Sequence, residues 1–133
     1  MKALVKNRNS VQVVNTAAPK ITREDDVLLQ VALAGLCRTD IYAATGKLKV
    51  KDPLVLGHEL AGVVEAVGPS VEGIKPGMRV TIDPALRCRQ CHRCKHDLSC
   101  TNSGFVGLDA DGGFAEQAVV PAYAVLPLDD SLS

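Results

Sequence analysis

The sequence is poor in aromatic side chains and contains no tryptophan. Phenylalanine and tyrosine together make up 3% of the 133 residues. The core must therefore be built from valine, leucine, isoleucine and alanine, and β-branched residues of this kind favour strands. Eleven glycines and seven prolines indicate many turns. We expect one soluble, mainly β domain over residues 1–133, since this length suits a single core.

Net charge and long apolar runs are also lacking. Fifteen basic residues balance fifteen acidic ones, which argues against a nucleic acid or an anionic membrane as a partner bound through bulk charge. No apolar run approaches the roughly 20 residues that span a bilayer, and no signal-peptide pattern follows Met1. We therefore expect a small-molecule ligand and a cytoplasmic location.

Apolar runs bounded by turn residues predict short strands and one helix. The strands are expected at residues 3–6, 11–14, 27–35, 63–67, 78–82 and, interrupted at Pro121, 114–126; the helix is expected at residues 38–45. The run at 27–35 is almost continuously apolar and so predicts a buried strand. Pro76-Gly77 fits the central positions of a type II turn, because proline presets the first φ and glycine accepts a positive second one. Residues 88–100 show no apolar periodicity, and we expect them to need a metal for order.

Four of the five cysteines lie close together, as Cys88, Cys91, Cys94 and Cys100. Tetrahedral zinc needs four donors that converge at about 2.3 Å, and two-residue gaps let the backbone wrap around one ion. The spacing predicts a structural zinc lobe over residues 87–101. The basic side chains there would partly offset the negative charge of four thiolates; they are Arg87, Arg89, His92, Arg93, Lys95 and His96.

Other uses of these cysteines stay open at this stage. The same spacing occurs in disulfide pairs and in redox dithiols. The arginines would also suit a zinc ribbon that contacts nucleic acid. The neutral charge and the scarcity of stacking aromatics disfavour that last interpretation.

The fifth cysteine belongs to a second constellation. Cys37 precedes Asp40, and His58 precedes Glu59, so a thiolate and an imidazole each have a carboxylate nearby. Taken alone, Cys37 would be a small buried side chain and His58 an ordinary core histidine. Together they resemble part of a catalytic zinc site, which uses three protein ligands and leaves one position open. A carboxylate beside a metal-bound imidazole commonly orients it.

The motifs around these residues resemble one family. The run Gly57-His58-Glu59-x-x-Gly62, followed by Gly68 and Val71, resembles the signature of zinc-containing medium-chain alcohol dehydrogenases. The upstream Cys37-x-Thr39-Asp40, the Pro76-Gly77-x-Arg79-Val80 segment and the four-cysteine lobe follow in that family's order. The resemblance covers essentially the whole chain. It implies a GroES-like, partly open β-barrel with short helices and a zinc-binding lobe.

The resemblance also implies roles for single residues. Cys37 and His58 would ligate catalytic zinc, and Thr39 would pass the alcohol proton toward solvent. Asp40 would hydrogen-bond His58, and Glu59 would lie behind the metal, which a carboxylate there visits in some members. Arg38 is a candidate for the cofactor pyrophosphate, because some members place arginine at this position and others glycine. Structural zinc would be bound by Cys88, Cys91, Cys94 and Cys100.

Two departures from the family pattern matter. The gap between Cys94 and Cys100 is five residues, where the family usually has seven, which makes Cys100 the least secure of the four lobe ligands. The family's third catalytic ligand, a cysteine or glutamate, lies beyond residue 133. So does its Rossmann domain, and no G-x-G-x-x-G occurs within these residues. We therefore expect the isolated chain to be inactive, to hold catalytic zinc weakly, and to expose the apolar face that meets the cofactor domain.

The implied function is an NAD- or NADP-dependent oxidoreductase that oxidises a secondary alcohol or polyol to a ketone, or the reverse. The full-length enzyme would be a homo-oligomer. The alternative is a non-enzymatic, zinc-stabilised GroES-like module, which has no need of the Cys37 and His58 constellation. A zinc-independent reductase of the same family is disfavoured, because such proteins usually lack both sets of cysteines.

Overall fold

The computed structural model describes residues 1–129, 131 and 132, and it is mainly β. Its strands are β1 (Lys2–Asn7), β2 (Ser10–Asn15), β3 (Asp26–Gly35), β4 (Leu54–Val55), β5 (Glu59–Val67), β6 (Arg79–Ile82), β7 (Ala85–Leu86), β8 (Gly104–Phe105), β9 (Gln117–Pro121) and β10 (Val125–Pro127). Its helices are α1 (Arg38–Ala44), the single turn α2 (His92–Lys95) and the 3-10 helix η1 (Ala122–Ala124).

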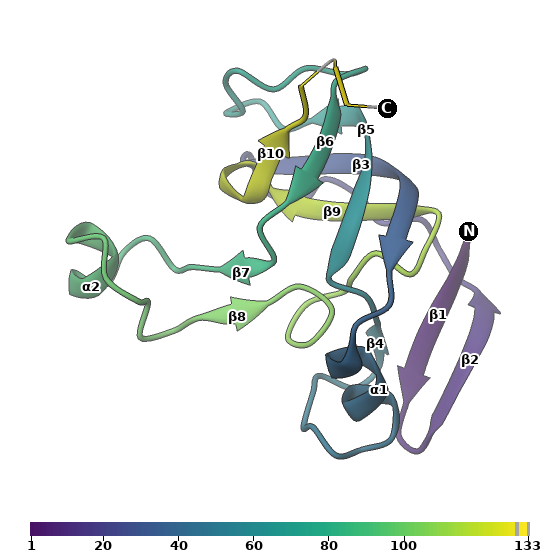
Figure 1. Cartoon of the computed structure of the whole chain (residues 1–133). Coiled ribbons are helices and arrows are strands. Elements are labelled where there is room, and N and C mark those ends of the chain that lie inside the picture. The colour runs from purple at the N-terminus through teal and green to yellow at the C-terminus, as the bar shows by residue number, and fades with distance from the viewer. Residues whose placement is uncertain (130, 133) are drawn as a thin grey trace.

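A five-stranded antiparallel sheet carries the core. Its strand order is β10-β6-β5-β3-β9, and Figure 1 shows how it curls on itself as a partly open barrel. A second sheet, β2-β1-β4, lies beside it and is joined to it where the Leu4 amide donates to the Phe114 carbonyl at 2.7 Å. The predominance of strands and the curled, partly open sheet confirm the predicted mainly β fold class.

The core is aliphatic, as the shortage of aromatics requires. Its largest members come from β3, β5, β6 and β9 and include Leu29, Val64, Val80 and Val120, each no more than 1% exposed. A smaller cluster of Ala43, Leu54 and Leu56 packs α1 against β4. This second cluster fixes the C-terminal half of α1 against β4 and the residues that follow it.

The predicted turns are present. β1 and β2 form the expected hairpin, and Arg8 in its turn has a φ of 52°. In the turn before β6, Gly77 has a φ of 89°, and the Met78 amide donates to the Lys75 carbonyl at 3.2 Å. A positive φ at the third residue of the turn is what a type II turn requires.

The prediction of a wholly buried strand at residues 27–35 is wrong for its second half. Val27 and Leu29 are fully buried, whereas Leu33 is 75% exposed. β9 pairs with β3 only as far as Gln30, and a register shift interrupts the β5 pairing between Val31 and Leu33. The apolar run therefore continues beyond the layer that covers it.

Other large apolar side chains are exposed near the end of β3. Leu36 is 70% exposed, Ile41 49% and Tyr42 42%. Their exposure agrees with the expectation of an uncovered apolar face at this end of the barrel. Within the part of the chain that the structure describes, no helix has the length and apolar character to cross a bilayer.

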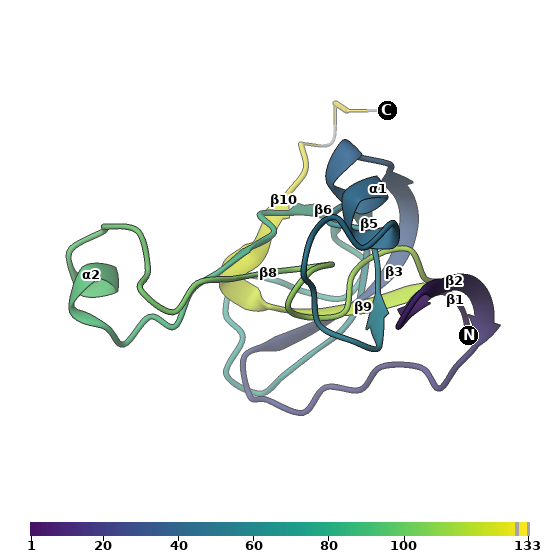
Figure 2. The same cartoon turned by 90° about the horizontal axis from the view of Figure 1, so that it is seen from below.

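Two regular elements of the lobe were not predicted from the sequence. Residues 92–95 form a helical turn, and the ladder of β7 and β8 closes the base of the lobe, with Ala85 opposite Phe105 and Leu86 opposite Gly104. Figure 2 shows this arm extending away from the barrel, with α2 at its end.

Candidate metal centres

The four lobe cysteines converge on one point. Their Sγ atoms all lie within 4.8 Å of one another; the Sγ of Cys88 is 3.4 Å from that of Cys100 and 3.9 Å from that of Cys94. Four sulfurs at about 2.3 Å from a tetrahedral ion would be about 3.8 Å apart. A disulfide needs about 2.05 Å, and all five cysteines are free. The arrangement fits a metal and not a pair of disulfides.

Backbone amides point at these sulfurs. The Cys91 amide donates to the Sγ of Cys88 at 3.4 Å, the Cys94 amide to that of Cys91 at 3.4 Å, and the Asn102 amide to that of Cys100 at 3.3 Å. Amide donors favour the thiolate form. Hydrogen bonds from Thr101 and Cys94 lower the pKa of the Cys91 thiol to about 5.

The neighbouring thiols compete for protons. Burial, helped by the thiols of Cys91 and Cys100, raises the pKa of Cys94 to about 12. Hydrogen bonds from the Cys88 amide and thiol lower the pKa of Cys100. The pKa shifts within the cluster thus run in opposite directions, and a cation at its centre would favour the thiolate form of all four cysteines.

The shortened spacing does not keep Cys100 away from the other three cysteines of the lobe. Its Sγ accepts the Cys88 amide at 3.3 Å, so five intervening residues are enough to bring the fourth sulfur to the group. The helical turn α2 takes up the intervening chain, with Cys91 as its N-cap. Histidines 92 and 96 are not part of the four-sulfur group.

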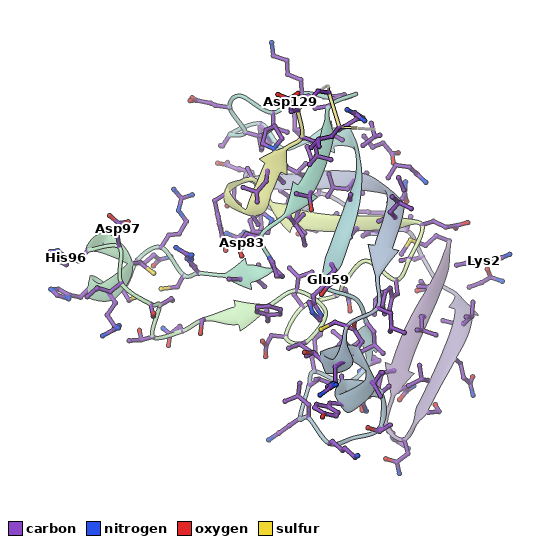
Figure 3. All side chains as sticks on the ribbon, viewed as in Figure 1. Lys2, Glu59, Asp83, His96, Asp97 and Asp129 are labelled. Atoms are coloured by element: carbon purple, nitrogen blue, oxygen red, sulfur yellow. The ribbon has the colours of Figure 1, made fainter. Side chains whose placement is uncertain are left out.

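A second group of possible ligands lies where β3, α1 and β5 meet. Single ligand atoms of Cys37, His58 and Glu59 all lie within 4.8 Å of one another. Cys37 is the N-cap of α1, and His58 and Glu59 stand at the start of β5. Figure 3 shows Glu59 at this junction, where β5 begins close to α1. Residues 21 positions apart in the chain are thus brought together by the fold.

Asp40 connects the two main members of this group. It is 2% exposed; one carboxylate oxygen, Oδ2, accepts the Cys37 amide at 2.9 Å, and the other, Oδ1, lies 3.2 Å from Nδ1 of His58. Both of these atoms are buried, and neither meets the geometry of a hydrogen bond, whether with the other or with any other described group. The carboxylate is therefore placed to hold a proton on Nδ1, which leaves the Nε2 lone pair free for a metal.

Glu59 lies on the open side of the group. Its side chain is 56% exposed, and its Oε1 is 3.9 Å from Nε2 of His58. The carboxylate also rests on the backbone of Gly35, where an added Cβ would lie 2.6 Å from Oε2. Only a residue without a side chain at position 35 leaves this space for the carboxylate.

Thr39 and Arg38 lie at the start of α1, as expected. The Thr39 hydroxyl is 3.6 Å from the Sγ of Cys37 and is half-buried. Arg38 is exposed. The structure thus brings Thr39 to the predicted group and leaves the guanidinium of Arg38 in solvent.

Sequence reasoning missed Phe105. Its ring meets the imidazole of His58 edge-on, with centroids 5.4 Å apart. Phe105 belongs to β8, which begins four residues after Cys100, so the base of the lobe reaches the second group directly. Nothing in the local sequence around Phe105 signals this contact, because it depends on the pairing of β7 with β8.

The chain was compared with known proteins. The family model for the GroES-like domain of alcohol dehydrogenases matches residues 23–130. The starvation-sensing protein RspB of Escherichia coli K12 is 38% identical over 122 residues, which are 90% of this chain and 36% of that protein. L-threonine 3-dehydrogenase of Pyrococcus abyssi is 35% identical over 133 residues, 94% of this chain and 38% of the enzyme.

Solved structures show the same likeness. The crystal structure of galactitol-1-phosphate dehydrogenase from Escherichia coli matches with a TM-score of 0.92 and 33% identity, over 100% of this chain and 39% of that one. The chain thus spans little more than a third of the length of the relatives it matches.

Proposed function

The chain belongs to the alcohol dehydrogenase family through its GroES-like domain, and from that premise we propose that it is the metal- and substrate-binding part of a zinc-dependent oxidoreductase. The proposed reaction interconverts a secondary alcohol or polyol and its ketone with NAD or NADP. The whole protein's activity is proposed here from a domain that covers about a third of its relatives.

The convergence of Cys37, His58 and Glu59 carries this proposal. A thiolate and an imidazole with a buried carboxylate behind the imidazole are the donors that a catalytic zinc site uses. A barrel that needed metal only for folding would already be served by the four-cysteine lobe. The placement of Asp40 Oδ1 3.2 Å from His58 Nδ1 supports the enzymatic proposal over a non-enzymatic module, because a carboxylate behind the imidazole is the contact that orients a metal-bound histidine.

Zinc held there would supply Lewis acidity, which lowers the pKa of a substrate hydroxyl. Side chains of this chain would orient the imidazole ligand and accept the proton that the substrate hydroxyl releases. The carboxylate of Asp40, whose Oδ1 lies 3.2 Å from Nδ1 of His58, would hold the imidazole proton on Nδ1 and leave Nε2 to the metal. The Thr39 hydroxyl, 3.6 Å from the Cys37 sulfur, can accept the proton of the substrate hydroxyl on Oγ1 while it donates its own proton outward.

Arg38 is proposed as a contact to the cofactor pyrophosphate, since it is exposed at the start of α1 and so is free to meet an anion. Glu59 is proposed as an additional ligand. Structural zinc is proposed for Cys88, Cys91, Cys94 and Cys100, where it would close the lobe above the β7–β8 ladder. A cytoplasmic location and a homo-oligomeric full-length enzyme stay predictions.

The proposed substrate is a secondary alcohol, in which the carbon that bears the hydroxyl group is bonded to two other carbons. Two of the similar proteins are named for L-threonine and for galactitol 1-phosphate, which supports a polar, hydroxylated substrate. The exposed apolar end of β3, with Leu33 and Leu36, is proposed as the face toward a nicotinamide-binding domain.

Cobalt substitution tests the proposal. Co²⁺ at a thiolate and imidazole site with an open position should give visible absorption bands that shift when galactitol 1-phosphate or L-threonine is added. The Cys37→Ser variant should lose this response. The matched Cys94→Ser variant should lose bands from the lobe and keep the response to ligand. A wild-type spectrum that no hydroxylated ligand changes would argue for the non-enzymatic module.

A further inference from the structure

Two histidines lie outside both groups described above. His92 is the first residue of α2, and His96 is the C-cap of the same turn. Their ring centroids are 4.4 Å apart, with the ring planes at 44°. Figure 3 labels His96 and Asp97 at the outer tip of the lobe, far from the barrel. Both imidazoles are exposed.

The four-residue spacing puts the two imidazoles on one face of the helical turn. Pairs of histidines at this spacing are a recurrent metal-chelating arrangement, since a nitrogen of each ring can meet one ion. Imidazole is a ligand for zinc, copper, nickel and iron and not for magnesium or calcium. The geometry thus selects borderline divalent ions.

The turn that carries the pair is held in place by its own backbone and by the cysteines. The Lys95 amide donates to the Cys91 carbonyl at 3.1 Å, and the His96 amide to the Arg93 carbonyl at 3.1 Å. The Cys91 sulfur caps the turn by accepting the Cys94 amide. Because the rings are already side by side, an ion would order little additional side-chain freedom on binding.

Two charged residues, Arg93 and Lys95, lie between the two histidines in sequence. Arg93 turns its Nε to the Ser99 carbonyl at 2.6 Å. Asp97 lines a hollow that it shares with Arg89 and Tyr123. The site would have two protein ligands, with water in the remaining positions.

We propose that His92 and His96 form a second metal-binding site of the lobe, distinct from the four cysteines, for a borderline divalent ion such as Ni²⁺, Cu²⁺ or Zn²⁺. The rival explanation is a contact between two aromatic rings with no metal affinity.

The test uses the zinc-loaded chain and Ni²⁺ alone, followed by amide NMR. Bound Ni²⁺ is paramagnetic and should broaden the signals of His92, Lys95 and His96 at equimolar metal, while elemental analysis finds the zinc content unchanged. His92→Gln and His96→Gln should each abolish this broadening. The matched control, Lys95→Gln, changes an exposed residue of the same turn and should keep it.

Three results would overturn the site. One is an absence of broadening in the lobe of the wild-type chain. Another is broadening that survives both histidine variants. The third is broadening that appears only as zinc leaves the chain, which would place Ni²⁺ on the cysteines. The amide spectrum of each variant before Ni²⁺ is added shows that the lobe remains folded.

Discussion

Replacing Asp40 by asparagine should weaken metal binding at the Cys37–His58 group far more than it weakens the fold. The substitution keeps the shape of a side chain that is 2% exposed. Its amide oxygen can still accept the Cys37 amide, which now bonds to Oδ2 at 2.9 Å. Its amide nitrogen would face Nδ1 of His58, now 3.2 Å from Oδ1, and would donate to it. The imidazole proton would then move to Nε2, the nitrogen that the metal needs.

The magnitudes follow from these contacts. Loss of a carboxylate behind a metal-bound imidazole typically costs about 10–100-fold in metal affinity, which is about 1.4–2.8 kcal/mol. In the metal-free chain, a charged hydrogen-bond acceptor is replaced by a neutral one, which should lower the free energy of unfolding by about 1 kcal/mol. The predicted signature of Asp40→Asn is thus a clear loss of affinity at this group and a small loss of stability.

The assay is a zinc titration of chain whose lobe is already loaded, in competition with a coloured chelator, together with urea unfolding of the metal-free chain. Asp26→Asn is the matched control. Asp26 is 5% exposed, and its Oδ2 accepts the amides of Thr22 at 3.0 Å and Arg23 at 2.8 Å. This control should lose stability and keep its zinc affinity. Equal zinc affinity in wild type and Asp40→Asn would refute the orienting role of Asp40.

Three further predictions concern the surroundings of the two groups. Phe105→Leu should keep the β7–β8 ladder but remove the ring edge 5.4 Å from the imidazole, so the His58 ring proton resonances should shift without loss of lobe zinc; unchanged resonances would contradict the contact. Gly35→Ala would place a methyl group 2.6 Å from Oε2 of Glu59, so the carboxylate should turn away and the second zinc should bind more weakly in the same titration. Because the Cys91 pKa falls from 9.0 to about 5 on folding, the metal-free folded chain binds fewer protons than the unfolded chain between these values; its stability should therefore increase with pH across that window and be lost as pH falls through about 5. Urea unfolding of the metal-free chain at several pH values measures this, and Cys91→Ser should reduce the slope.

The local parts of the fold could be predicted from the sequence. The β1–β2 hairpin and the turn at Pro76-Gly77 follow from residues that fix their own backbone angles. The cysteine spacing indicated the lobe because all four proposed ligands come from one short segment of the chain. Family resemblance then supplied the barrel and brought Cys37 and His58 into one site.

The features that could not be predicted from the sequence depend on contacts between distant segments. β4, β7 and β8 have two residues each, too few to show any periodicity, and they exist only through their partners. The exposure of Leu33 also has no local signal, because it depends on where β9 ends. The same holds for the Phe105 ring against His58, which requires the ladder at the base of the lobe.

We expect the chain to hold two separate metals. One is bound tightly in the lobe, and the other more weakly at Cys37 and His58, where the third ligand is an exposed carboxylate. Zinc per chain tests it most directly, measured by elemental analysis after dialysis and again with added zinc, for the wild type and for Cys37→Ser and Cys94→Ser. We predict one zinc after dialysis, lost in Cys94→Ser and kept in Cys37→Ser, and a second that appears only with added zinc and requires Cys37. A tightly held zinc that survives Cys94→Ser, or a second zinc indifferent to Cys37→Ser, would contradict the claim.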